Sequence, residues 1–524
     1  MNLSALDAAI LAAYVAALFG VGIWAARTPS RTAEDYFLAG RQIPWLVTAA
    51  SFLATAISAL TLIGGPAEGY SSDCRYLFGN VGDIAAAFFV AAVFLPYYQK
   101  TRVTSIYETI DRRFGRGARV AASGYFLISR TLASTVRVVA AAKVLEVASG
   151  GALSYPWAVT VTILLILAYS TAGGGKAIAW TDLLQFLLIA AAAVATIVFI
   201  AGRVPGGVPA ILHAARHART PDGSFYDKLN FLELLRPRNL GLFALIASWG
   251  FFNSAAAYGT DQDLVQRLLM CDDPRKARWG LILSVLASVP IALIFLLIGV
   301  AIYAFAQSHP DFAAGVGDPD RVFPRFILYA MPSGLKGLLL AALAAAAMGS
   351  SNSALAALAT SFTVDFYKTW KGDGAAAQTL RVSRASFVGF GLGFLVLALL
   401  LPRWDDLLWL GFRMVSFTYG PLLGLFALAI LTDWRVPSKS LVGLMLGSTA
   451  VSLTLAILAW KLSPGDGAGF WRALHADYWR LYVPAGAAVV FLGGRATRQG
   501  AGTPGTLPIT PARRPGPGPG EPWR

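Results

Sequence analysis

The chain has 524 residues, of which 56% are hydrophobic and only 14% are charged, with a formal net charge of +15 and a mean hydropathy of +0.60. A soluble protein of this length carries about a quarter charged residues, so the composition excludes a water-soluble fold and indicates a membrane protein. The basic excess does not imply nucleic acid as a partner, because its distribution among the loops has another explanation.

Hydrophobic windows predict thirteen transmembrane helices, since many apolar blocks reach the roughly 20 residues that cross a hydrocarbon core. In chain order the predicted spans are 4–26, 43–69, 77–98, 119–148, 153–171, 176–202, 240–262, 279–307, 335–362, 385–402, 405–432, 438–460 and 481–494. We therefore expect an all-α polytopic membrane protein in a lipid bilayer.

Lysine and arginine gather on one side of these spans. The loops concerned, with the tail, are 27–41, 100–119, 267–278, 368–384, 435–439 and 495–524. On the other side, basic residues lie mainly in the long stretches 203–239 and 308–334, and long loops cross membranes largely regardless of charge. The asymmetry predicts a cell-membrane protein with its N-terminus outside and its C-terminus in the cytoplasm.

The two ends of the chain carry further expectations. The first span has no cleavage site of small residues after a basic start, so it is expected to be retained and not removed as a signal peptide. The tail 496–524 is rich in glycine, proline and arginine and is expected to be disordered in the cytoplasm. No signalling domain follows the last span, which argues against a transporter-fused sensor.

Residues for covalent or metal chemistry are sparse. Cys74 and Cys271 fall in loops on opposite sides of the membrane, which excludes a disulfide and a thiolate metal site. The four histidines lie in outer loops, and no nucleophile–base pair is visible in the sequence. These observations argue against an enzyme.

The polar residues at membrane depth carry the functional signal, because each costs several kcal/mol unless it faces a cavity or a partner. In the second span, small hydroxyl residues are followed by Gly64, Gly65 and Pro66, a composition that permits a break in the helix. The alternative is close helix packing through small residues.

Three later spans show the same character. Asp182 in the sixth span is either a snorkelling interfacial charge or a way-station for a cation. The seventh span, 248–261, is crowded with Gly, Asn, Ser and Tyr. The ninth carries the run from Met348 to Ser353, which packing alone explains poorly.

Carbonyl and hydroxyl oxygens suit sodium, and an unwound helix frees its carbonyls for such an ion. The second and seventh spans lie five helices apart, as expected if each opens one of two inverted five-helix repeats. The chain then divides into a first helix (1–30), a first repeat (43–203), an outer loop (204–239), a second repeat (240–432), two C-terminal helices (433–495) and the tail (496–524).

The fourth span contains two arginines, Arg130 and Arg137, which are seven residues apart and therefore on one helix face, with Ser134 between them. An arginine well inside a span is rare without a partner. Arg137 either forms an ion pair with Asp83 or Glu146, or binds the carboxylate of a solute bidentately.

Six motifs in chain order resemble the sodium:solute symporter family, which includes carriers of sugars, proline, iodide, vitamins, monocarboxylates and sialic acid. They are 35–41 (DYFLAGR), 104–114 with its TSIYE and RF, 174–185 with its GGKA and WTDLLQ, 261–267 with its DQ and QR, 361–367 (SFTVDFY) and 416–424 (SFTYGPLLG). The resemblance implies a LeuT-type, five-plus-five inverted-repeat fold and sodium-coupled transport by alternating access.

The resemblance also implies a sodium site between the second and ninth spans. Its ligands would be the carbonyls of Ala54, Ile57 and Ala346 and two hydroxyls, at positions 349 and 350. The chain departs from the family here, because Gly349 has no hydroxyl and only Ser350 keeps one, so Ser351 or water would complete the shell. Asp182 matches a family aspartate associated with cation passage or a second sodium.

The substrate positions implied by the resemblance are less polar than a sugar requires, because an unpaired buried polar group costs roughly 1–3 kcal/mol. They are Ala56, Leu60, Thr61, Ser254, Ala257 and Tyr258. Together with Arg137 they predict sodium-coupled symport of a monocarboxylate or another small organic anion or amino acid. The alternatives are a proton-coupled or sodium-independent carrier of the same fold and a substrate-sensing membrane receptor.

Overall fold

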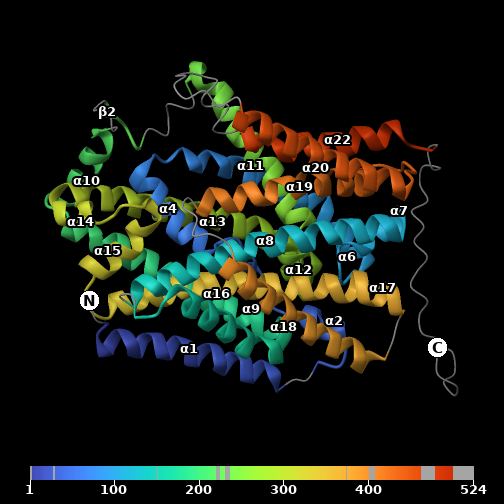
Figure 1. Cartoon of the computed structure of the whole chain (residues 1–524), viewed down its shortest axis with the longest axis horizontal. Helices are drawn as coiled ribbons and strands as arrows, with labels where there is room; N and C mark the ends of the chain where they lie inside the picture. The colour runs from blue at the N-terminus through green and yellow to red at the C-terminus, as the bar shows by residue number, and fades with distance from the viewer. Residues whose placement is uncertain are drawn as a thin grey trace.

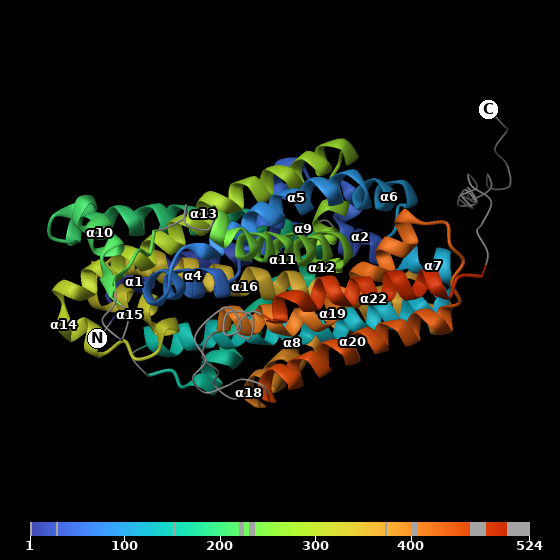
Figure 2. The same cartoon turned by 90° about the horizontal axis from the view of Figure 1, so that it is seen from above.

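The computed structural model describes residues 3–27, 30–149, 152–219, 225–229, 236–372, 375–400, 407–461 and 478–499. Long helices run side by side along one axis of the molecule (Figure 1). The short helices α10, α14 and α15 lie at one end of this bundle, and α7 and α17 lie at the other (Figures 1 and 2). The architecture is that of a polytopic helical membrane protein.

The helices that form the predicted spans are α1 (Ala5–Ala26), α3 (Trp45–Ala56), α4 (Ala59–Ser71), α5 (Gly79–Ala92), α6 (Phe94–Thr101), α8 (Arg116–Ala148), α9 (Tyr155–Arg203), α11 (Leu240–Thr260), α13 (Pro274–Ser308), α16 (Leu335–Ser361), α18 (Ala376–Leu400), α19 (Leu407–Leu431), α20 (Ser438–Lys461) and α22 (Tyr482–Ala496). The remaining elements are α2 (Ala33–Leu38), η1 (Ala39–Arg41), η2 (Arg75–Phe78), α7 (Glu108–Phe114), α10 (Gly207–Arg216), β1 (Ala218–Arg219), β2 (Phe225–Tyr226), η4 (Pro237–Asn239), α12 (Gln262–Leu269), α14 (Pro310–Ala314), η5 (Pro319–Arg321), α15 (Val322–Ala330), the π-helix η6 (Phe362–Tyr367), α17 (Lys368–Lys371) and η7 (Tyr478–Leu481). The strands β1 and β2 form one antiparallel pair.

Each of the thirteen predicted spans coincides with helix in the structure. The fifth and sixth spans are the two halves of α9, which Gly174 divides with backbone angles of φ 55° and ψ −148°. Within the described residues, nine helices are long and apolar enough to cross a membrane, or ten with the bent pair α3 and α4. The span that begins at Leu335 is 89% buried, so α16 is the central helix.

The second span is broken near its middle, and a second break follows α11 at the end of the seventh span. The helices α3 and α4 meet at an angle of 54°, with Ile57 and Ser58 in extended conformation between them. The helices α11 and α12 are separated by Asp261, which is also extended. The breaks fall in the second and seventh spans, the positions that an inverted five-helix repeat requires.

The break in the second span lies earlier than the sequence favoured. The prediction placed helix-breaking capacity at Gly64, Gly65 and Pro66, but these residues lie inside α4. Here the alternative holds, because the glycines serve close packing: a Cβ added to Gly65 would lie 3.1 Å from Phe295 of α13. On the facing helix, a Cβ on Gly299 would lie 2.1 Å from the carbonyl oxygen of Pro66.

The loops divide between the two ends of the bundle as the charges predicted. The long stretches 203–239 and 308–334 supply α10, α14 and α15 at one end, and the basic loops supply α7 and α17 at the other (Figure 1). The expectation of a disordered tail concerns 496–524, of which 500–524 lie outside the described residues.

A buried lysine ties the outer loop to the end of α4. The Nζ of Lys228 donates to the carbonyl oxygens of Tyr70 at 2.8 Å and Ser72 at 2.7 Å, which caps the carboxyl end of the helix. The amide of Cys74 donates to the carbonyl of Lys228 at 3.1 Å. Burial lowers the pKa of Lys228 to about 8 and raises the pKa of the Cys74 thiol to about 12.

Cys74 is expected to react with a water-soluble maleimide on the order of a thousandfold more slowly than an ordinary thiol, because only the thiolate attacks. Lys228→Ala should accelerate the reaction by releasing the loop that covers the sulfur. The measurement is the alkylation rate by mass spectrometry in a Cys271→Ser background. Equal alkylation rates for the wild type and Lys228→Ala would show that Lys228 does not hold the loop over Cys74.

Candidate functional site

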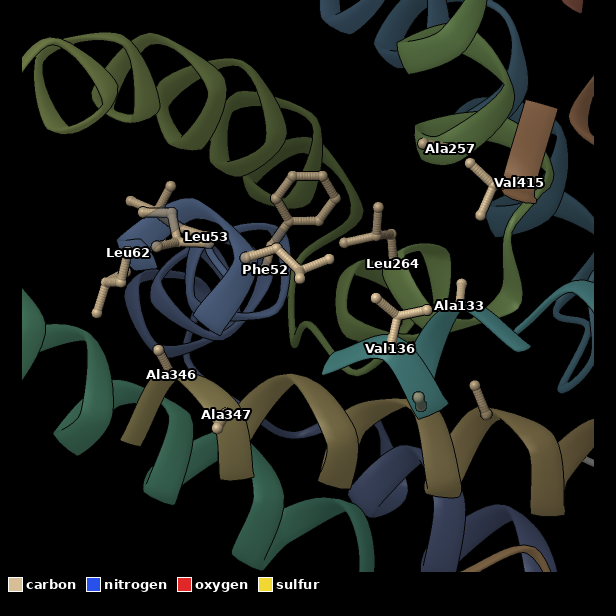
Figure 3. Close-up of a cluster of buried hydrophobic side chains, with 14 of the residues drawn as sticks. Phe52, Leu53, Leu62, Ala133, Val136, Ala257, Leu264, Ala346, Ala347 and Val415 are labelled. Atoms are coloured by element: carbon tan, nitrogen blue, oxygen red, sulfur yellow. The ribbon is translucent and has the colours of Figure 1, made fainter. Parts of the chain in front are cut away.

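The broken helices surround a cavity of about 180 Å³ in the middle of the bundle. Its walls come from α3, α4, α5, α8, α11, α12, α13 and α19. Figure 3 shows apolar lining residues from four of these helices, namely Ala133 of α8, Ala257 of α11, Leu264 of α12 and Val415 of α19. The cavity is the natural place for a small solute, because transporters of this architecture bind at the membrane midplane beside broken helices.

The structure brings every sequence-predicted substrate position to this cavity. The lining includes Ala56, Leu60, Thr61, Arg137, Ser254, Ala257 and Tyr258. They come from three separate parts of the sequence, namely the pair α3 and α4, α8, and α11. Their role as substrate ligands stays a prediction.

The cavity is more polar than the sequence predicted. Asn80 and Asp83 of α5 and Asn253 of α11 also line it, and none of the three was predicted. Asp83 was considered only as a partner of Arg137, yet its carboxylate accepts a hydrogen bond from Ser254 at 2.6 Å. The expectation of an apolar lining is therefore wrong for the wall formed by α5 and α11.

The break between α3 and α4 releases backbone carbonyls beside the cavity. In a continuous helix the amides of Leu60 and Thr61 would bond to Ala56 and Ile57. Here the amide of Leu60 bonds to the Ser58 hydroxyl at 3.2 Å, and the amide of Thr61 bonds to the Ser58 carbonyl at 2.9 Å. The carbonyls of Ala56 and Ile57 thereby lose their helical donors and become available to a cation.

The other predicted sodium ligands lie around this break. Ala54 and Ile57 are buried, and Ala346 of α16 faces the broken pair (Figure 3). The Ser350 hydroxyl donates to the carbonyl of Ala346 at 2.9 Å, which leaves its own oxygen lone pairs free to coordinate. The chemistry of this oxygen set fits sodium, although coordination by these atoms stays a prediction.

Gly349 faces a second group of oxygens. A Cβ at this position would lie 2.3 Å from Oε1 of Gln185 and 3.7 Å from Oδ1 of Asp182, so a serine fits only if Gln185 moves. Asp182 is fully buried, and its carboxylate accepts hydrogen bonds from Ser51 at 2.5 Å and Ser353 at 3.5 Å. A snorkelling charge at the membrane surface is thus wrong for Asp182.

The group around Asp182 keeps unused acceptors. Oδ1 of Asp182 and Oε1 of Gln185 are buried and lack hydrogen-bond partners within the described residues. Gln185 was not predicted as a site residue, although its position three residues after Asp182 puts both on one face of α9. Buried oxygen acceptors without donors are the ligands that hard cations prefer.

The two arginines of α8 have different surroundings. Arg130 is buried and pairs with Asp261 at 3.2 Å and with Asp263. Tyr419 donates a hydrogen bond to Asp261 at 2.7 Å, which completes a closed network across α8, α12 and α19. Nothing in the sequence indicates that Arg130, and not Arg137, takes these partners.

Arg137 carries no ion pair within the described part of the chain, and its Nε and Nη1 are buried without hydrogen-bond partners. Its side chain lines the cavity. The predicted ion pair with Asp83 or Glu146 is not formed, because Arg137 lies within ion-pair distance of neither carboxylate among the described residues. An unpaired guanidinium in a small cavity is chemically prepared to bind a planar anion.

A second charged network closes the end of the bundle near α7. Asp365 of η6 is fully buried and accepts hydrogen bonds from Ser105 at 2.7 Å and Ser123 at 2.9 Å. Arg119 pairs with Asp365 at 2.9 Å and with Asp111 at 3.0 Å. The network joins α7, α8 and η6, which belong to both halves of the chain.

Known proteins resemble this chain over most of its length. It is 27% identical to the sodium/sialic acid symporter NanT of Aliivibrio fischeri over 458 residues, which cover 87% of this chain and 87% of the relative. It is 30% identical to the human sodium-coupled monocarboxylate transporter 1 over 453 residues, which cover 84% of this chain and 71% of the relative.

The solved structure of a sodium-coupled sialic acid symporter in a substrate-bound, outward-open state aligns with a TM-score of 0.78 at 25% identity. It covers 95% of this chain and 98% of that structure. The transporter Mhp1 shares the fold, with a TM-score of 0.52 at 17% identity. The inverted-repeat fold is thereby confirmed.

The family model described as the sodium:solute symporter family matches residues 36–447. The match contains both broken spans, the cavity and the group around Asp182. It confirms the predictions of a membrane carrier rather than an enzyme and of sodium as the coupling ion. The chain belongs to the sodium:solute symporter family.

Proposed function

We propose that the protein is a sodium-coupled symporter of a small solute that bears a carboxylate, moved across the cell membrane by alternating access. The N-terminus would lie outside and the C-terminus in the cytoplasm, as the basic loops indicate. The core would comprise the two repeats 43–203 and 240–432.

The observation that carries the proposal is Arg137, an arginine that lines the cavity with no counter-ion among the described residues. An uncompensated buried charge is costly, so such a group is expected to meet its partner in the bound solute. A guanidinium matches a carboxylate with two parallel hydrogen bonds. The relatives support this chemistry, because sialic acid and monocarboxylates, named for those proteins, both carry a carboxylate.

Sodium binding and solute binding would be coupled because both sites use the break between α3 and α4. Ala56 and Ile57 line the cavity, and the break that contains them also offers carbonyls to the predicted sodium site. An ion that fixes the geometry of the break therefore changes the shape of the solute site, and by linkage the solute changes sodium affinity by the same factor.

Ser350→Ala is expected to weaken the apparent sodium affinity of uptake about 10-fold or more, because a hydroxyl ligand of the ion is lost. Uptake of a panel of labelled carboxylates is measured in proteoliposomes over a series of external sodium concentrations. The matched control is Ser383→Ala on α18, whose buried hydroxyl bonds to the carbonyl four residues earlier at 2.9 Å, as that of Ser350 does.

Unchanged sodium dependence in Ser350→Ala would contradict the ligand assignment. Uptake that ignores the sodium gradient but follows a proton gradient would favour the second candidate, a proton-coupled carrier. That candidate rests on Gly349, where the expected hydroxyl ligand is missing.

A further inference from the structure

We propose that the cavity has a second charged subsite at Asp83 and that the solute is a zwitterion whose ammonium group binds there. The inference rests on the proposed function for its other half, the binding of the carboxylate by Arg137. It narrows the solute from small carboxylates in general to amino acids and related molecules.

Glycine contacts set the position of Asp83. A Cβ on Gly250 of α11 would lie 2.1 Å from the carbonyl oxygen of Gly79, so α5 and α11 touch backbone to backbone. One turn further along each helix, Asp83 and Ser254 face one another, because residues four apart lie on the same face. The contact brings the Asp83 carboxylate to 2.6 Å from the Ser254 hydroxyl, and both residues line the cavity.

The wall around Asp83 offers hydrogen-bond acceptors to a solute. Its carboxylate is partly exposed to the cavity, and no lysine, arginine or histidine pairs with it among the described residues. A carboxylate has about four lone-pair sites, of which the Ser254 hydroxyl uses one. The Oδ1 of Asn253, which also lines the cavity, is buried without a donor.

Asp83 and Arg137 lie at the same depth on different walls. The helices α8 and α11 run in opposite directions, since Tyr107, just before α7 and α8, bonds to Thr260 at the end of α11. The ion pair between Arg130 of α8 and Asp261, directly after α11, marks one common level along the two helices. Seven residues from this pair along either helix, a rise of roughly 10 Å, lie Arg137 on α8 and Ser254 on α11.

The cavity thus presents a cation on one wall and an anion on the other, and the two do not pair with each other within the described residues. A solute with one carboxylate would satisfy Arg137 but bring a second negative charge near Asp83. Specific sites commonly reject wrong partners in this way, by a charge left unpaired or repelled. A zwitterion can pair its carboxylate with Arg137 and its ammonium group with Asp83.

The test compares matched acids that differ only at the second group. Propionate, lactate, L-alanine and β-alanine form one matched set, butyrate and γ-aminobutyrate a second, and cyclopentanecarboxylate and proline a third. All are titrated in sodium against the purified full-length protein by tryptophan fluorescence and thermal shift. In the wild type the amino acids should bind about 10- to 150-fold more tightly than their amine-free partners. Asp83→Asn, which keeps an acceptor for Ser254, should bring that ratio close to one.

The controls separate the two proposals. Exposed Asp433→Asn should retain the wild-type ratio. Equal affinities for alanine and propionate in the wild type would overturn the zwitterion while leaving the carboxylate site intact. Lactate binding as tightly as alanine would also overturn it, because Asp83 would then recognise any donor. Binding of none of the acids, with or without nitrogen, would instead contradict the proposed function.

Discussion

Replacing Arg119 by methionine is expected to destabilise the folded protein by about 3–5 kcal/mol, the usual cost of removing one partner from a buried ion pair. Asp365 would remain fully buried with only the hydroxyls of Ser105 and Ser123 as donors. The measurements are the midpoint of thermal unfolding in detergent and the monodisperse yield by size-exclusion chromatography.

The double variant Arg119→Met with Asp365→Asn is the matched control. It removes both charges while the asparagine keeps an acceptor for the two hydroxyls, so much of the lost stability should return. Asp111, which is 35% exposed, should tolerate Asp111→Asn with a small effect, since surface pairs contribute about 1 kcal/mol or less. Equal midpoints for wild type and Arg119→Met would show that the network is not an ion pair in the protein.

Replacing Arg137 by glutamine is expected to raise the half-saturation constant for an acidic solute about 10- to 150-fold, because a buried charge-assisted hydrogen bond is worth about 1.5–3 kcal/mol. Arg137→Lys should recover only part of this loss, since an ammonium cannot offer the planar fork of the guanidinium. Initial uptake rates over a range of solute concentrations give the constant.

The structural alternative for Arg137 predicts a different pattern. If the guanidinium served stability through Asp83 or Glu146, Arg137→Gln would lose folded protein, and neutralising the carboxylate as well would restore it. Robust uptake of a neutral sugar, without competition from carboxylates, would contradict the carboxylate site altogether.

The fold followed from the sequence because hydrophobic length is a local property. A stretch such as 279–307 is long enough to span a bilayer whatever surrounds it, and the structure has α13 there. The tendency of a helix to break is also encoded locally, but the residue at which it breaks depends on packing against other helices. The second span opens at Ile57 and Ser58, since the glycines that follow are occupied in packing against α13.

The site was predictable only in part, because its charges find their partners across helices. Arg130 and Arg137 are chemically identical and lie on the same face of one helix. Arg130 nevertheless pairs with Asp261, whereas Arg137 has no carboxylate partner among the described residues. Asp83 gained its place in the cavity through the contact of Gly79 with Gly250, which are 171 positions apart and carry no local signal.

The glycine contact between α5 and α11 also has a mechanical consequence. Where the backbones of two helices touch, neither helix can slide or rotate against the other without a steric clash. The pair α5 and α11 is therefore expected to move as one rigid body. A movement of the bundle would then carry the wall with Asp83 and Ser254 as one rigid piece. The hydrogen bond between Asp83 and Ser254 is therefore expected to be the same in every conformation of the transporter.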